Sequence, residues 1–176
     1  MSDYLDALFH PDHPLMGMDD VNSTRNNIFG GQDFYNAAGQ QTGMTMQNVL
    51  GGYDYYDAGG KYLGHSRENV FGGQDFFDAE GHYLGHNREN IAGGHDFISA
   101  DGSEYVHSQD NPQGGHIYLG SDGQIGESRA NIFGGEDYTW HGQDLLNAQA
   151  DWQDNLINNY DDPLSQIKSW SFPPLV

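Results

Sequence analysis

The chain contains no cysteine and few basic residues. Its 176 residues include 6 Lys and Arg against 26 Asp and Glu, so the formal net charge is −20 at pH 7. Without cysteine it has no disulfide, thiolate metal site or cysteine nucleophile. The negative charge argues against direct binding to nucleic acid and to anionic membranes, because both carry repelling phosphates. We therefore expect neither as a direct partner.

Long apolar segments are also missing. No run approaches the ~20 apolar residues that a membrane-spanning helix needs. The first six residues are acidic and lack the basic and apolar regions of a secretory signal, so we expect a cytoplasmic protein. Leu, Ile, Val and Phe make up only about 19% of the chain, which is near the composition of disordered proteins. The 11 Tyr, 3 Trp and 25 Gly instead favour a folded, turn-rich chain.

A repeat of 21 residues organises the middle of the chain. An Asn followed three residues later by a pair of glycines recurs six times, with steps of 21, 21, 21, 21 and 20 residues. The six motifs begin at Asn27, Asn48, Asn69, Asn90, Asn111 and Asn131. A fixed period of this kind indicates an array of equivalent structural units.

Each repeat contains three short apolar points separated by turn residues. In the clearest copy they are Val70/Phe71, Phe76/Phe77 and Tyr83/Leu84. Short aromatic and β-branched runs bounded by glycine predict strands, and no helix of ~12 residues fits between the glycines. We expect a tight turn at residues 78–81, with Gly81 at positive φ, and a second corner at the pair Gly72 and Gly73.

The pattern therefore predicts an all-β repeat protein, with two possible architectures. One is a β-solenoid, in which each repeat supplies three short strands. The other is an array of stacked β-hairpins, in which Asp75–Ala79 pairs with His82–Arg88. In both, neighbouring repeats bury the apolar points in a continuous core, because one repeat cannot bury them alone.

The repeats divide the chain into three parts. Residues 1–26 form an N-terminal cap segment with a helix over Ser2–Phe9, and residues 27–140 form the six-copy array, whose last copy is partial. Residues 141–176 form a helix that begins at Asp144, followed by an extended apolar tail. Four apolar residues of this last part are candidates for capping or partner binding: Trp152, Leu156, Trp170 and Phe172.

Acidic residues recur in two columns of the repeat. One column lies two residues after the glycine pair and the other three residues later; they contain Asp33, Asp54, Asp75, Asp96, Asp137 and Asn36, Asp57, Asp78, Ser99. Such side chains accept hydrogen bonds from turn amides, or they bind Ca²⁺ through their oxygens. The spacing matches no calcium motif, so we predict no metal site.

Histidine and arginine also occupy fixed positions. His65, His86 and His107 share one column, and His95 and His116 share a second column with Gln32, Tyr53 and Gln74. We expect these histidines on a solvated outer face; the alternatives are a metal site or a pH sensor. The column Arg25, Arg67, Arg88 and Arg129 is expected to pair with the acids.

The chain carries no catalytic motif. A nucleophile elbow, a phosphate-binding loop and a His-Glu-x-x-His helix are all missing. We therefore expect a protein that is not an enzyme and has no cofactor.

The regular carboxylates favour a non-enzymatic, acidic protein-binding module. Its sharpest form is an inhibitor that mimics DNA and occupies the basic groove of a nucleic-acid-binding protein. The candidate acidic face comprises Asp33, Asp54, Asp57, Glu68, Asp75, Asp78, Glu89, Asp96 and Asp137. The alternatives are a structural or self-assembling β-repeat protein and a surface repeat that binds Ca²⁺ or another ligand. The oligomeric state is left open.

Overall fold

The computed structural model describes residues 9–10, 13–17, 20–102, 104–120 and 123–141, and every regular element in these ranges is a β-strand. Within them, no helix could span a membrane. The strands are β1 (Phe9–His10), β2 (His13–Gly17), β3 (Ser23–Asn26), β4 (Gln32–Tyr35), β5 (Gln41–Gln47), β6 (Tyr53–Asp57), β7 (Tyr62–Glu68), β8 (Gln74–Asp78), β9 (Tyr83–Glu89), β10 (Gly93–Ser99), β11 (Glu104–Asp110), β12 (His116–Gly120), β13 (Gly123–Ala130) and β14 (Glu136–Trp140).

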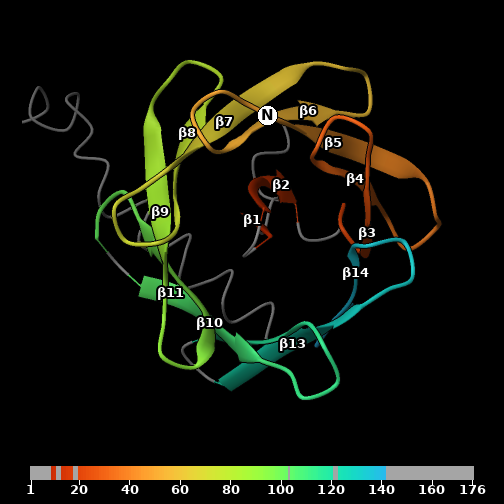
Figure 1. Cartoon of the computed structure of the whole chain (residues 1–176), viewed down its shortest axis with the longest axis vertical. Coiled ribbons are helices and arrows are strands. Elements are labelled where there is room, and N and C mark those ends of the chain that lie inside the picture. The colour runs from red at the N-terminus through yellow and green to blue at the C-terminus, as the bar shows by residue number, and fades with distance from the viewer. Residues whose placement is uncertain (1–8, 11–12, 18–19, 103, 121–122, 142–176) are drawn as a thin grey trace, which may run out of the picture.

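Strands β3 to β14 form a closed antiparallel barrel (Figure 1). Each strand pairs with its neighbours along the chain, and β14 pairs with β3 to close the ring. Each 21-residue period therefore contributes two strands. Because consecutive strands run in opposite directions, the six loops that contain the repeated Asn and glycine pair all lie at one rim. Turns such as residues 78–82 lie at the other rim.

The sequence predicted the all-β hairpin array correctly, but the solenoid was wrong. The hairpin formed by β8 and β9 pairs Asp75 with His86 and Phe77 with Tyr83, close to the predicted pairing, and Gly81 has a φ of 86°. A solenoid needs a third strand at Val70/Phe71, and these residues lie in a loop instead. Closure into a barrel also satisfies the sheet edges that an open array would leave unpaired.

Two rings of repeated side chains fill the barrel. One is a buried aromatic ring made of Phe34, Tyr55, Phe76, Phe97, Tyr118 and Tyr138. The other is polar: its members accept a hydrogen bond from the backbone N–H that follows the glycine pair of the preceding repeat. This polar ring comprises Thr24, Thr45, Ser66, Asn87, Ser108 and Ser128. Because side chains alternate across a strand, both rings point inward.

A short hairpin made of β1 and β2 lies inside the barrel (Figure 1). The imidazole of His13 packs against Phe34, with ring centroids 4.6 Å apart, and Met16 is buried. Glycine at position 43 leaves room for this hairpin, because a Cβ there would lie 2.7 Å from Cε of Met16. The hairpin therefore packs against the aromatic ring inside the barrel.

The predicted terminal helices receive no support. Residues 2–8 of the first helix and the whole of the second lie outside the described residues, and Phe9 belongs to β1. Residues 23–26, which the sequence placed in the cap segment, form β3 of the barrel.

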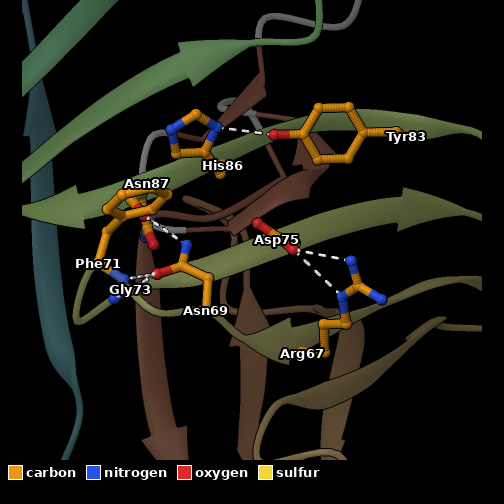
Figure 2. Close-up of polar contacts among 8 residues, drawn as sticks. All are labelled: Arg67, Asn69, Phe71, Gly73, Asp75, Tyr83, His86 and Asn87. Atoms are coloured by element: carbon orange, nitrogen blue, oxygen red, sulfur yellow. Dashed lines mark hydrogen bonds and ion pairs between the residues drawn. The ribbon is translucent and has the colours of Figure 1, made fainter.

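The same asparagine contact joins every repeat to the next. Nδ2 of Asn69 donates to the carbonyl oxygen of Asn87 at 2.9 Å, and its Oδ1 accepts from the N–H groups of Phe71 and Gly73 (Figure 2). At the closure point, Nδ2 of Asn131 donates to the carbonyl oxygen of Thr24, also at 2.9 Å. The last repeat therefore binds the first as the third binds the fourth.

We expect Asn131→Ala and Asn69→Ala to lower the free energy of unfolding equally, by about 2 kcal/mol, because each leaves the same backbone groups without a partner. The measurement is urea denaturation followed by circular dichroism. Ile132→Ala, at a fully exposed neighbour, is the control and is expected to change it by less than about 0.5 kcal/mol. A much smaller loss for Asn131→Ala than for Asn69→Ala would mean that the array is open.

Candidate functional site

The loops at the rim that contains the repeated Asn form the candidate functional surface, because they expose large apolar side chains. Asn69 ties its loop back through both ends of its amide, and the equivalent Asn does so in the other loops. In each loop a Cβ on the second glycine, such as Gly73, would overlap the carbonyl oxygen of the next repeat. The loop backbone therefore lies flat against its neighbour. The first residue after the Asn points into solvent, and the second is about half exposed, with Phe71 beside His86 and Phe133 beside Arg25.

These two residues form an exposed apolar ring, which we call the crown. The side chain of the first residue after the Asn is at least 92% exposed in five of the six loops. The side chain of the second residue is 48–61% exposed in four of them. The crown comprises Ile28, Phe29, Val49, Leu50, Val70, Phe71, Ile91, Ile132 and Phe133. Neighbouring loops are two strands apart, or ~10 Å, so the apolar tips of five loops follow one rim, which is interrupted at the loop with Pro112 and Gln113.

The exposure of the crown corrects the expectation that all three apolar points of each repeat are buried. Phe76 is buried and Leu84 packs against the core, whereas Val70 and Phe71 are exposed. Large aliphatic side chains that are fully exposed at equivalent positions of one rim mark an interaction surface.

Inside the crown the barrel opens into a polar cavity of about 680 Å³, which we call the cup. Each repeat contributes to its wall the side chain directly after the glycine pair, and these are Gln32, Tyr53, Gln74, His95, His116 and Glu136. They point inward for the same reason as Phe76, which lies two residues after Gln74 on β8. Phe76, Tyr55, Tyr138 and His13 also line the cup.

The cup has a negative electrostatic character. Its lining includes the carboxylates of Glu136 and Glu68, and none of the described residues that line it is Lys or Arg. Burial alone would raise the pKa of Glu136, but the neighbouring imidazole of His116 and the hydroxyl of Ser128 outweigh this and hold the pKa below its ordinary value. Glu136 is therefore anionic at neutral pH, with Oε1 3.7 Å from Nδ1 of His116.

His13 is partly buried and lines the cup from the inner hairpin. Burial lowers the pKa of its imidazole to about 4, although the charge of Glu136 acts in the opposite direction. The ring is therefore neutral at pH 7 and adds no positive charge to the cup.

The predicted acidic face is divided among three places. Asp33, Asp54, Asp75, Asp96 and Asp137 lie on the outer wall of the barrel, one residue along from the cup residues. Asp57 and Asp78 lie at the opposite rim, where their Oδ1 atoms accept from turn amides as one of the two interpretations predicted. Glu68 and Glu89 lie at the crown rim beside Gly51 and Gly72 of the neighbouring loops. Trp152, Leu156, Trp170 and Phe172 lie outside the described residues.

Partners surround the acids of the outer wall. Arg67 binds Oδ2 of Asp75 through Nε and one terminal nitrogen (Figure 2), and Arg88 binds Asp96 in the same way. Burial would raise the pKa of Asp96, but hydrogen bonds from Asn90 and Arg88 hold it below its ordinary value. The expected pairing of arginine with acids is thus confirmed for Arg67 and Arg88.

Two of the predicted histidine positions meet tyrosine on the outer wall. Nδ1 of His65 lies 3.0 Å from the hydroxyl of Tyr62, and Nδ1 of His86 lies 2.7 Å from that of Tyr83 (Figure 2). His95 and His116 instead point into the cup, so the outer-face expectation was wrong for this column. Across the described residues, no three His, Asp or Glu side chains are grouped closely enough to hold a metal ion.

Sequence reasoning did not identify the cup as a site. The column Gln32, Tyr53, Gln74, His95 and His116 was visible in the repeat, but its period gave no indication that the column faces inward. Comparison with protein-family models, curated proteins and solved structures finds no match for this chain.

The buried imidazole predicts a specific pH dependence of stability. The pKa of His13 is about 4 in the folded protein and 6.5 in the unfolded chain, so the unfolded chain takes up the proton first as the pH falls. The free energy of unfolding therefore keeps its full value above pH 6.5 and decreases as the pH falls toward 4. At pH 4.5 we expect a loss of about 2 kcal/mol relative to pH 7 from this group.

The test compares urea denaturation of the wild type and His13→Gln at the two pH values. The difference between the proteins isolates His13 from acidic groups such as Glu136, and exposed His107→Gln is the control. An equal pH dependence in the wild type and His13→Gln would contradict the burial of a neutral imidazole.

Proposed function

We propose that the protein is a non-catalytic binding module that docks onto a partner protein through its crown. The observation that carries this proposal is the ring of nine large apolar side chains exposed at one rim. Burying a single Val, Leu, Ile or Phe side chain contributes roughly 1.5–3 kcal/mol. A partner that covered several of them would therefore bind firmly.

The charge around the crown selects the chemistry of that partner. Glu68, Glu89 and Asp110 occupy equivalent positions on the inner side of the rim, and among the described residues neither Glu68 nor Glu89 forms an ion pair. The nearby arginines are engaged: Arg67 and Arg88 by aspartates, and Arg25 by the rings of Tyr35 and Phe133 at 4.4 and 4.5 Å. The complementary partner surface is apolar at its contact points and basic between them.

A nucleic-acid-binding protein is one partner of this chemistry, so inhibition by occupation of a basic groove remains part of the proposal. The contact surface differs from the predicted one, however. The acids of the outer wall are held by Asn and Arg, whereas the acids of the rim surround the apolar ring. We therefore place the contact at the rim.

The test uses four versions of the protein in affinity capture, with each captured protein identified and its binding re-measured in purified form. They are the wild type, a crown variant with Ile28, Val49, Val70, Ile91 and Ile132→Ser, a rim variant with E68Q, E89Q and D110N, and an outer-wall variant with D33N, D54N and D137N. We expect the crown variant to bind more than about 100-fold more weakly, because it removes several buried apolar contacts. The rim variant is expected to lose the salt-sensitive part of binding, and the outer-wall variant to bind as the wild type does.

Two controls make the result specific. Exposed substitutions change stability little, so the crown variant is expected to unfold within about 0.5 kcal/mol of the wild type. Light scattering of the isolated protein tests whether a second copy covers the crown. Undiminished binding by the crown variant, or loss of binding by the outer-wall variant together with elution by DNA, would overturn docking through the crown.

A further inference from the structure

The crown surrounds a cavity that docking of an apolar surface does not use. The cup holds about 680 Å³, and none of the nine crown side chains lines it. Its wall is built from one side chain of each repeat, and these side chains are polar, whereas the equivalent positions two residues deeper are all aromatic. This change of chemistry within each strand produces a polar chamber with an aromatic floor.

The charges in the chamber exclude one class of ligand. Glu136 is anionic and Glu68 stands at the mouth, while the described lining contains no Lys or Arg. Phosphates and carboxylates would therefore be repelled. His116 lies beside Glu136, with its Nδ1 3.7 Å from Oε1, so it faces a carboxylate of the protein itself.

The remaining groups favour a cation that carries several hydrogen-bond donors. Gln32 and Gln74 offer amide oxygens from two walls, and Glu136 offers a carboxylate from a third. The ring of Tyr53, which is only partly buried, lines the same chamber, and aromatic faces attract guanidinium and ammonium groups within ~6 Å.

We propose that the cup binds an alkylguanidinium group, with Glu136 as the counter-ion, the Gln32 and Gln74 amides as acceptors and the ring of Tyr53 against the alkyl stem. A planar guanidinium has five donors, can pair with a carboxylate through two of them, and keeps others for further acceptors. The group comes either from an arginine side chain that protrudes from the partner or from a free small molecule. Only the first source rests on the proposed function.

The probe is butylguanidinium, titrated into the full-length protein and followed by isothermal calorimetry and NMR. We expect saturable binding, with its neutral analogue butylurea at least about tenfold weaker because it cannot pair with a carboxylate. Glu136→Gln is expected to weaken butylguanidinium binding about tenfold, and Glu68→Gln by a smaller factor because Glu68 is more exposed.

Asp137→Asn is the matched control. It removes the same charge from the next residue of β14, but on the outer wall, so we expect unchanged binding. Absence of saturable binding, equal binding of butylurea, or equal losses in Glu136→Gln and Asp137→Asn would each overturn the assignment. Thermal unfolding of the variants checks that each is folded.

Two further arms identify the source of the group and keep the two proposals separate. Competition between butylguanidinium and a captured partner supports an arginine side chain as the ligand, whereas simultaneous binding supports a free small molecule. The crown variant with five serines is expected to bind butylguanidinium normally, because its substitutions lie outside the cup. The experiments can therefore contradict docking through the crown while they support guanidinium binding in the cup. They can equally contradict guanidinium binding while they support docking.

Discussion

Six asparagine side chains determine how the repeats of this protein fit together. In every loop the Asn side chain donates to a carbonyl oxygen of the next repeat. Its Oδ1 accepts hydrogen bonds from two backbone N–H groups of its own loop in five loops, and from the N–H of Gln113 in the loop of Asn111. The same side chain thus shapes the loop and sets its distance from the neighbour. Because Asn131 makes this contact with Thr24 of the first repeat, the interaction that joins two repeats also closes the ring.

The tight contact between repeats explains the glycine pair and the crown together. The first glycine, Gly72 in the third loop, has a φ of 77°, and the second allows the carbonyl oxygen of the next repeat to approach. With the loop backbone fixed in this way, Val70 has no part of the barrel to pack against, and Phe71 meets it only at His86, with ring centroids 5.9 Å apart. Their exposure is thus a direct consequence of the interaction that stabilises the fold.

Alternation along the strands gives neighbouring residues of similar chemistry different environments. Glu136 faces the cup beside His116, whereas Asp137 faces outward and accepts from Nδ2 of Asn131 at 3.1 Å. Gln74 and Asp75 divide in the same way on β8. A list of acidic positions therefore describes no single surface, and the face of the strand decides whether a carboxylate lies on the outer wall with Asn and Arg or lines the cup.

The sequence predicted four features correctly, because glycine spacing and strand alternation are local properties. These are the 21-residue period, the turn at Gly81, the hairpin of β8 and β9 and the absence of a helix within the array. The apolar pair Val70/Phe71 was misread as core, since hydrophobicity alone does not distinguish a strand from the tip of a loop. Closure into a barrel, and with it the cup, could not be predicted. It depends on contacts between residues more than 100 positions apart, such as Asn131 with Thr24, and on the angle between neighbouring hairpins. The sequence by itself determined the repeating unit; only the tertiary structure decided which side of each unit faces inward, because the same hairpins can stack in a row or close in a ring.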